Sequence, residues 1–348
     1  MQGNPRGRAA FHRLPLALAA AIGLGFALPA AAQTPDADWA KVVAAAKQEG
    51  RVVVYNASSA ERHSALSRAF EKKYGVTVDL LNARSSEIRE RIRSEQQVGR
   101  ALADLTITSA ATAWLQAESG TFQPHGFLPQ ATKLISPYKD DGTVIPISLS
   151  RYGILINTDL IKPGDEPKSW WDLTDPKWKG KILSDDPRAS GGTNQAFIVL
   201  YDVLGRGFHE KLRDQDLVFG RDTQLNLRRI GRGEYPIYTV LTLPDLANVR
   251  GLPVKGIVPK EGSPYIPLVL AMLKNAPHSN AARLYMNFFL EDEAQQMMIE
   301  AGLGSPTGLK SDSIPEEFKS LTDAKAMGTP APDQQEKMLT VMQELYTR

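Results

Sequence analysis

The stretch RVVVYNASSAERHSALSRAFEKKYGVTVDLL, residues 51–81, decides the fold class of this chain. Its first five residues are a β-branched run that predicts a strand, and residues 76–81 predict a second strand. Ser58 and Ser59 stand where a helix begins, and the apolar residues that follow them have helical spacing. A helix that connects two strands in this way is typical of an α/β protein.

The same alternation continues on the carboxyl side of this stretch. Ser85 and Ser86 open another helix, residues 105–108 form a short buried strand, and Ser109 leads into a helix around Trp114. The resulting β-α-β-α-β order predicts a sheet that is covered by helices on both faces.

A second unit of the same kind is predicted from about residue 147, and 348 residues are enough for two such units. Residues 151–157 predict a strand, and the turn 190–193 introduces an apolar helix. Further strands are expected at 182–184, 235–239 and 266–273, and further helices at 222–232, 280–290 and 292–301.

The first 32 residues have the composition of a secretory signal peptide. They carry Arg6, Arg8 and Arg13 near the start, continue in an apolar run and end in Ala30-Ala31-Ala32. The run is shorter than the ~20 residues of a membrane span, so we predict Sec-type export with cleavage after Ala32. Loss of three of the 41 basic residues leaves 38 against 39 acidic ones, a net charge of −1. Without a cysteine for a lipid anchor, we predict a free protein in the periplasm of a Gram-negative bacterium.

The composition argues against several classes of function. The chain has no cysteine, and its five histidines stand at none of the usual zinc spacings. The G-x-S-x-G motif is absent, and an S-x-x-K match at residues 136–139 lacks its companion motifs. The near-neutral charge argues against nucleic-acid binding. We therefore predict no enzyme activity, no metal, no cofactor and no nucleic-acid partner.

Three serine-rich turns between predicted strands and helices are candidates for a binding site: Ser58-Ser59, Ser109 and Ser190-Gly191-Gly192-Thr193. A helix N-terminus offers unpaired N–H groups and the positive end of a dipole, which suit an anion. N-capping alone would also explain such residues. Open α/β sheets, however, bind ligands at the carboxyl ends of their strands, which favours a site.

Arg151 and Arg188 are the candidate cations, because a guanidinium can hold a carboxylate or a phosphate through two parallel hydrogen bonds. Arg151 begins an apolar strand, an unusual place for a solvated charge, and a salt bridge is the alternative for both arginines. Tyr152, Tyr238 and Tyr265 could line a pocket, with packing in the core as the alternative.

Residues 170–182, WWDLTDPKWKGKI, resemble the tryptophan signature of bacterial extracellular solute-binding proteins. Residues 277–284, PHSNAARL, and residues 69–75, AFEKKYG, are similar to further segments that these proteins share. The resemblance covers nearly all of the mature chain. It points to the type 2 periplasmic binding protein group, in the branch that binds ferric iron, thiamine, aminoethylphosphonate or sugar phosphates.

The resemblance implies an α/β protein of two lobes and two hinge crossovers, which close on a ligand in the cleft between the lobes. We place residues 33–146 and 247–305 in lobe 1, and residues 147–246 and 306–348 in lobe 2 with a C-terminal helical tail. The loaded protein, expected to be a monomer, would dock on an ABC transporter permease in the inner membrane. A periplasmic ligand sensor subunit is the alternative.

The ligand is where the sequence differs from the iron-binding branch. Ferric binders there use two adjacent tyrosines, a histidine and a glutamate. Here no adjacent tyrosines follow Tyr238, and Ser59 and Ser109 occupy the positions of the histidine and the glutamate. Ferric iron prefers hard anionic oxygen ligands, which serines do not supply.

The resemblance also places Arg151 and the Ser190-Gly191 turn where that branch contacts an anion. We therefore predict a small organic anion, carboxylate or phosphorylated, with ferric iron or an iron chelate as the alternative. The predicted ligand-binding residues are Ser58, Ser59, Ser109, Arg151, Tyr152, Ser190, Gly191, Gly192, Thr193, Tyr238 and Thr239.

Overall fold

The computed structural model describes residues 35–311, 324–331 and 334–347, so the predicted signal peptide and its cleavage site lie outside the described residues. The strands are β1 (Arg51–Asn56), β2 (Thr77–Asn82), β3 (Leu105–Ser109), β4 (Val144–Asn157), β5 (Ile182–Asp185), β6 (Val218–Gly220), β7 (Ile237–Thr242), β8 (Val254–Ile257), β9 (Ser263–Met272) and β10 (Ala326–Gly328). The helices are α1 (Pro35–Glu49), α2 (Ala60–Tyr74), α3 (Ser85–Gln97), α4 (Ala110–Glu118), α5 (Gly192–Leu204), α6 (Arg206–Arg213), α7 (Thr223–Gly231), α8 (Ser279–Phe289), α9 (Asp292–Glu300) and α11 (Gln335–Tyr346).

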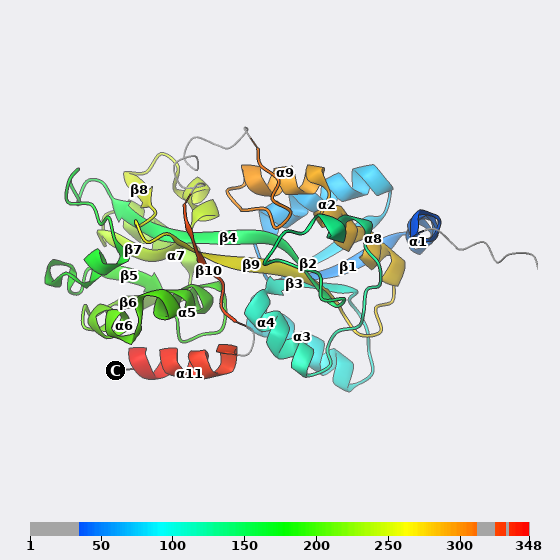
Figure 1. Cartoon of the computed structure of the whole chain (residues 1–348), viewed down its shortest axis with the longest axis horizontal. Coiled ribbons are helices and arrows are strands. Elements are labelled where there is room, and N and C mark those ends of the chain that lie inside the picture. Colours follow the sequence, from blue (N-terminus) through cyan, green and yellow to red (C-terminus); the bar gives the residue numbers. More distant parts are fainter. Residues whose placement is uncertain (1–34, 312–323, 332–333, 348) are drawn as a thin grey trace, which may run out of the picture.

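The strands of the described residues join in one sheet, in the order β2-β1-β3-β9-β4-β7-β5-β6, with β10 beside β9 and β8 beside β4. At one end of the sheet β1 pairs in parallel with β2 and β3. At the other end β5 pairs in parallel with β6 and β7. The predicted α/β class is confirmed, and Figure 1 shows helices around both ends of the sheet.

The first end of the sheet carries its own hydrophobic core. Leu66 and Phe70 lie one turn apart on α2, so both point to the same side of the helix, where they are buried. Phe288 and Phe289 of α8 come from a distant part of the sequence and complete this core, with Phe70 and Phe288 ring centroids 5.5 Å apart. Burial of each such aromatic ring stabilises the fold by about 1.5–3 kcal/mol.

The other end of the sheet has a second core. Phe197 of α5, Phe208 of α6 and Tyr346 of α11 are buried together with Trp170 of the predicted tryptophan signature. The indole of Trp170 donates a hydrogen bond to the carbonyl of Gly262 at 3.0 Å, which satisfies its polar atom in the core. The C-terminal helix α11 therefore packs beside α5 and α6, as Figure 1 shows.

Two long antiparallel strands connect the two cores. The first half of β4, from Val144 to Arg151, pairs with β9. The second half of β4 pairs with β7 and β8. In Figure 1, β4 and β9 run side by side through the middle of the molecule. β4 is thus twice as long as the strand predicted at residues 151–157, because its first half, with Pro146 inside it, lacks an unbroken β-branched run.

Most of the predicted helices and strands are present within a few residues of their expected bounds. The short elements α6, β6 and β8 were not predicted, because segments of three to eight residues leave little periodic pattern. The division into lobes stays a prediction. The pairing of β8 with the far half of β4 argues for moving residues 254–257 out of the first lobe.

Candidate functional site

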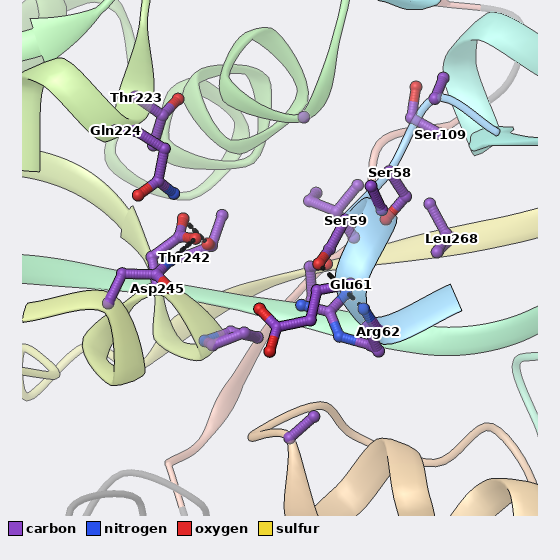
Figure 2. Close-up of a pocket in the computed structure, with 18 of the residues that line it drawn as sticks. Ser58, Ser59, Glu61, Arg62, Ser109, Thr223, Gln224, Thr242, Asp245 and Leu268 are labelled. Carbon is purple, nitrogen blue, oxygen red and sulfur yellow. Dashed lines mark hydrogen bonds between the residues drawn. The ribbon is translucent and has the colours of Figure 1, made fainter. Parts of the chain in front are cut away.

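A cleft of about 1240 Å³ lies between the two cores. Figure 2 shows its two walls: Ser58, Ser59, Glu61, Arg62 and Ser109 on one side, and Thr223, Gln224, Thr242 and Asp245 on the other. Residues of β9, including Leu268, also line the cleft. Side chains from distant parts of the sequence therefore face one another across a space that suits a small molecule.

The N-terminus of α2 forms one wall of the cleft. Ser59 is the N-cap, and its hydroxyl oxygen accepts a hydrogen bond from the backbone N–H of Arg62 at 3.4 Å. Arg62 lies in the first helical turn, and its half-buried side chain lines the cleft. Burial lowers the pKa of Arg62, while the charges of Asp245 and Glu61 raise it. The guanidinium still carries its charge at neutral pH, because arginine does not deprotonate in proteins.

The N-terminus of α5 faces the cleft from the other side. Its N-cap is Gly191, which has no side chain that could cap the helix. Gly192 lies against Tyr152, since a Cβ atom at residue 192 would be only 2.2 Å from the tyrosine hydroxyl oxygen. Glycine is therefore required at this close approach, and the hydroxyl of Tyr152 lies beside the first turn of α5.

The second wall also carries two carboxylates. Asp185, at the carboxyl end of β5, accepts hydrogen bonds from Thr223 Oγ1 at 2.5 Å and from Asn226 Nδ2 at 2.7 Å. Asp245 accepts a hydrogen bond from the hydroxyl of Thr242. Burial raises the pKa of Asp245 most, Thr242 and Arg62 lower it, and Asp185 raises it. The wall opposite Arg62 is therefore acidic.

The charges of these carboxylates act on two tyrosines of the cleft. The Tyr238 hydroxyl forms a hydrogen bond with the Asp185 carboxylate. The pKa of Tyr238 is raised well above its usual value, first by burial and then by the charge of Asp185. Burial raises the pKa of Tyr152 as well, with smaller contributions from Asp245 and Asp185. Both phenols are protonated at neutral pH, so each presents a hydroxyl donor.

Val240 is a strained residue in the wall of the cleft. Its φ is 54°, in the left-handed region that β-branched residues rarely adopt. It stands at a bulge in β7, where the pairing with β4 slips between Gly153 and Ile154. The side chain is buried and lines the cleft. Strain of this kind persists where the surrounding structure holds it, often at functional sites.

The structure brings most of the predicted site residues together. Those that line the cleft are Ser58, Ser59, Ser109, Tyr152, Gly192, Thr193 and Tyr238. Ser190 and Gly191 precede α5 but are not among the lining residues, and Thr239 is buried beneath the surface. Ser59 also has the capping role that was the alternative for these serines.

Arg151 is not in the cleft, which corrects the prediction that it is the cation of this site. Ser150 and Tyr152 line the cleft, and successive side chains of a strand point to opposite faces. The Arg151 guanidinium instead lies 5.1 Å from the ring centroid of Tyr265. Arg188, the other candidate cation, forms a salt bridge with Asp186 at 2.7 Å, the alternative that was left open for it.

Arg62, Asp185 and Asp245 were not predicted as site residues. For Arg62 a signal was present, because it stands three residues after the N-cap serine of a predicted helix. Asp185 directly follows the strand predicted at residues 182–184, and the carboxyl end of a strand is the usual place for ligand contacts in α/β sheets. Asp245 stands in the 3₁₀ helix η4 (Leu243–Val249), and only tertiary packing brings it to the cleft.

Among the described residues, no three histidines or acidic residues cluster closely enough to hold a metal ion. The helices within those same ranges are all too short or too polar to cross a bilayer.

An α/β fold with a ligand-sized cleft between two cores is an architecture that holds small molecules. Residues 101–330 match the family model described as bacterial extracellular solute-binding protein, and the chain belongs to that family. Two-lobed proteins of this kind carry solutes to ABC transporters.

A relative from Salmonella typhimurium, provisionally named a 2-aminoethylphosphonate-binding periplasmic protein, is 26% identical over 275 residues. The match covers 74% of this chain and 77% of the relative. The fold is that of periplasmic binding protein AfuA from Actinobacillus pleuropneumoniae, solved with fructose-6-phosphate: TM-score 0.70, 22% identity, 85% of this chain and 98% of the other covered. Iron-bound HitA from Pseudomonas aeruginosa is similar too: TM-score 0.71, 19% identity, 85% and 99% covered.

Proposed function

We propose that this solute-binding protein captures a small organic anion, a carboxylate or a phosphorylated compound, in the cleft. The protein would act in the periplasm as a monomer and deliver the anion to an ABC transporter permease in the inner membrane. The observation that carries the proposal is the uncapped N-terminus of α5, beside the hydroxyl of Tyr152 and across the cleft from Arg62.

The two walls supply complementary parts of an anion site. Free N–H groups at the start of α5 and the Tyr152 hydroxyl can donate hydrogen bonds to oxyanion oxygens. Arg62 adds a positive charge and can form two parallel hydrogen bonds with a carboxylate or a phosphate. Ser58, Ser59 and Ser109 can donate from the same wall as Arg62. Arg62 thereby takes the role that the sequence suggested for Arg151.

The carboxylates of Asp185 and Asp245 favour anions that also carry an amino group. A ligand with only negative groups would be repelled by these side chains, whereas an ammonium group would pair with them. The Salmonella relative is named for 2-aminoethylphosphonate, which has both kinds of group. The structure of AfuA contains fructose-6-phosphate, an anion without an amine. We expect the amino-bearing compound to bind more tightly.

A thermal-shift titration tests the proposal with three probes: 2-aminoethylphosphonate, fructose 6-phosphate and citrate. A ligand that binds the folded state raises the melting temperature by mass action. We expect at least one probe to do so, and Arg62→Ala to weaken that probe by roughly 10–150-fold, as loss of a charged hydrogen bond of about 1.5–3 kcal/mol implies.

Arg93→Ala is the matched control, because Arg93 is exposed on α3 and pairs with Glu90 at 2.5 Å, a neighbour on the same helix. It should leave the affinity unchanged. The proposal is wrong if no probe shifts the melting temperature, or if Arg62→Ala binds as tightly as Arg93→Ala.

Ferric iron is the second candidate ligand. Asp185, Asp245, Tyr152 and Tyr238 all line the cleft and offer the hard oxygen donors that ferric iron prefers. Iron binding would require Tyr152 or Tyr238 to lose its proton, against the raised pKa values of both. Titration with ferric citrate decides between the candidates, because tyrosinate coordination produces a visible charge-transfer band and the organic-anion proposal predicts none.

A further inference from the structure

Part of the cleft wall is apolar, and the proposed function does not use it. Five aliphatic side chains of α2, β9 and the end of α9 line this part, which we call the apolar side: Ala65, Leu66, Leu268, Met297 and Ala301. The whole cleft, at about 1240 Å³, is larger than the ~300–1,000 Å³ of most small-molecule sites. A compound as small as 2-aminoethylphosphonate therefore leaves room beside it.

The helices α2 and α9 lie next to each other and run in opposite directions. Lys73, in the last turn of α2, forms a salt bridge of 3.1 Å with Glu293, in the first turn of α9. Ala65 in the first half of α2 and Ala301 at the end of α9 both line the cleft. Figure 1 shows the two helices side by side. Their apolar residues therefore belong to one continuous part of the wall.

Leu268 and Met297 are the larger side chains of the apolar side that remain partly exposed. Each is half-buried, packs against the first hydrophobic core and lines the cleft. Leu268 pairs with Ser109 across β9 and β3, and Figure 2 shows it on the side of Ser58, away from Thr223. The first core thus reaches the cleft as apolar surface, and a ligand group that covers such surface gains from its removal from water.

Polar groups find few partners at the end of α9. The carbonyls of residues 297–299 already accept hydrogen bonds from the backbone N–H groups of residues 301–303. Glu300 accepts a hydrogen bond from Gln296 at 2.8 Å, and its charge adds to the negative end of the helix dipole. An oxyanion is therefore repelled here and favoured at Arg62 and α5. A hydroxyl group on the apolar side would lose its hydrogen bonds with water.

We propose that the apolar side binds an aliphatic or aromatic substituent of the ligand. The substrate class is then an amino-bearing organic anion with such a substituent, and not a sugar phosphate. The inference rests on the proposed function, because Arg62, the start of α5 and the acidic wall would hold the charged groups of the same ligand.

Two phosphonates that differ only in a phenyl group test the inference: 1-aminoethylphosphonate and 1-amino-2-phenylethylphosphonate. Each is titrated calorimetrically against the full mature protein. We expect the phenyl compound to bind about tenfold more tightly or better, because its ring leaves water. Its heat capacity of binding should also be more negative, which is the marker of buried apolar surface.

Met297→Gln keeps the length of the side chain but makes its end polar. It should reduce the advantage of the phenyl compound by about threefold or more and leave the affinity for 1-aminoethylphosphonate unchanged. Met327→Gln is the matched control. Met327 of β10 is also half-buried, but it packs against the second core and is not among the residues that line the cleft.

Equal affinities of the two phosphonates for the unmodified protein would overturn the inference and leave the proposed function standing. An equal phenyl advantage in Met297→Gln and Met327→Gln would overturn it too. If Met297→Gln does not fold, Leu268→Thr replaces it under the same criterion. The inference also falls if neither phosphonate binds. In that case the proposed function falls with it only if 2-aminoethylphosphonate, fructose 6-phosphate and citrate fail to bind as well.

Discussion

The helices α2 and α5 both point their N-termini into the cleft, but the two N-termini are capped differently. α2 is capped by the side chain of Ser59, and its first turn supplies the cation Arg62. α5 begins after Gly191 without any side-chain cap, and Gly192 lets the Tyr152 hydroxyl come close. In the α2 wall, the Ser59 side chain accepts a hydrogen bond from a backbone N–H of the first turn, and the Arg62 side chain offers a positive charge to a ligand. The other wall leaves backbone donors free for a ligand.

Each helix also belongs to a core that buries one histidine. His63 lies on α2, and neither of its ring nitrogens has a partner among the described residues. His209 lies on α6 against Phe197 of α5, and its Nδ1 is 2.7 Å from the hydroxyl of Tyr346. Burial lowers the pKa of each imidazole from 6.5 to about 3.

The largest predicted effect is therefore loss of stability in acid, from both cores. The unfolded chain takes up a proton at each histidine below pH 6.5, while the folded chain does not. Stability is complete above pH 6.5 and falls as the pH is lowered, by about 2 kcal/mol per histidine at pH 5. Urea unfolding at pH 7.5 and pH 5.0 measures the difference, which should be about 4 kcal/mol for the two residues together.

Single variants separate the two cores. His63→Leu and His209→Leu should each remove about half of this pH dependence. At pH 7.5 they should differ, because His209→Leu leaves the buried Tyr346 hydroxyl without its partner and His63→Leu breaks no hydrogen bond that involves the imidazole. If neither variant changes the dependence on pH, the acid sensitivity comes from other groups and the comparison of the cores fails.

The second prediction concerns the open end of α5. Gly192→Ala places a methyl group where the Tyr152 hydroxyl lies, so one of the two must move. We expect a loss of stability of about 1–3 kcal/mol, as for other overpacked sites, together with weaker ligand binding. Thermal unfolding and titration with the best probe of the cleft measure the two effects.

Gly192→Ala combined with Tyr152→Phe is the control, because removal of the hydroxyl oxygen relieves the contact. Stability should return in the double variant, and ligand affinity should stay low because the donor is gone. Full recovery of affinity in the double variant would show that the Tyr152 hydroxyl does not contact the ligand.

The sequence predicted the alternation of helices and strands well, because each long element carries its own periodic pattern. The site was harder to predict. Arg151 and Tyr152 were both placed in it, as were Tyr238 and Thr239, although neighbours on a strand point to opposite faces. The strands were predicted, but which of their faces would line a cleft depends on packing between distant segments. Asp245 comes to the cleft beside Arg62 only through tertiary structure, so no local sequence pattern could have predicted it as a site residue.

The third prediction tests the strain at Val240. A β-branched residue at φ 54° costs about 1–2 kcal/mol, and alanine in the same conformation costs less. Val240→Ala should therefore destabilise the protein by about 1 kcal/mol less than Val54→Ala, which removes the same atoms from a buried strand of the other core. Denaturant unfolding of both variants measures the difference. Equal losses would mean that the bulge holds Val240 without strain.

The smallest predicted effect is at the capped end of α2. Ser59→Ala removes the acceptor for the Arg62 N–H and should cost about 0.5–1 kcal/mol, at the low end for a cap because the bond is 3.4 Å long. Asp222→Ala at α7 is the matched comparison, since that cap bonds Leu225 N at 2.9 Å and should cost more. Ser59→Gly should cost only a few tenths of a kcal/mol. A ligand affinity that falls in Ser59→Ala beyond this loss of stability would show that Ser59 donates to the ligand as well as capping α2, whereas an unchanged affinity would leave capping as its only role.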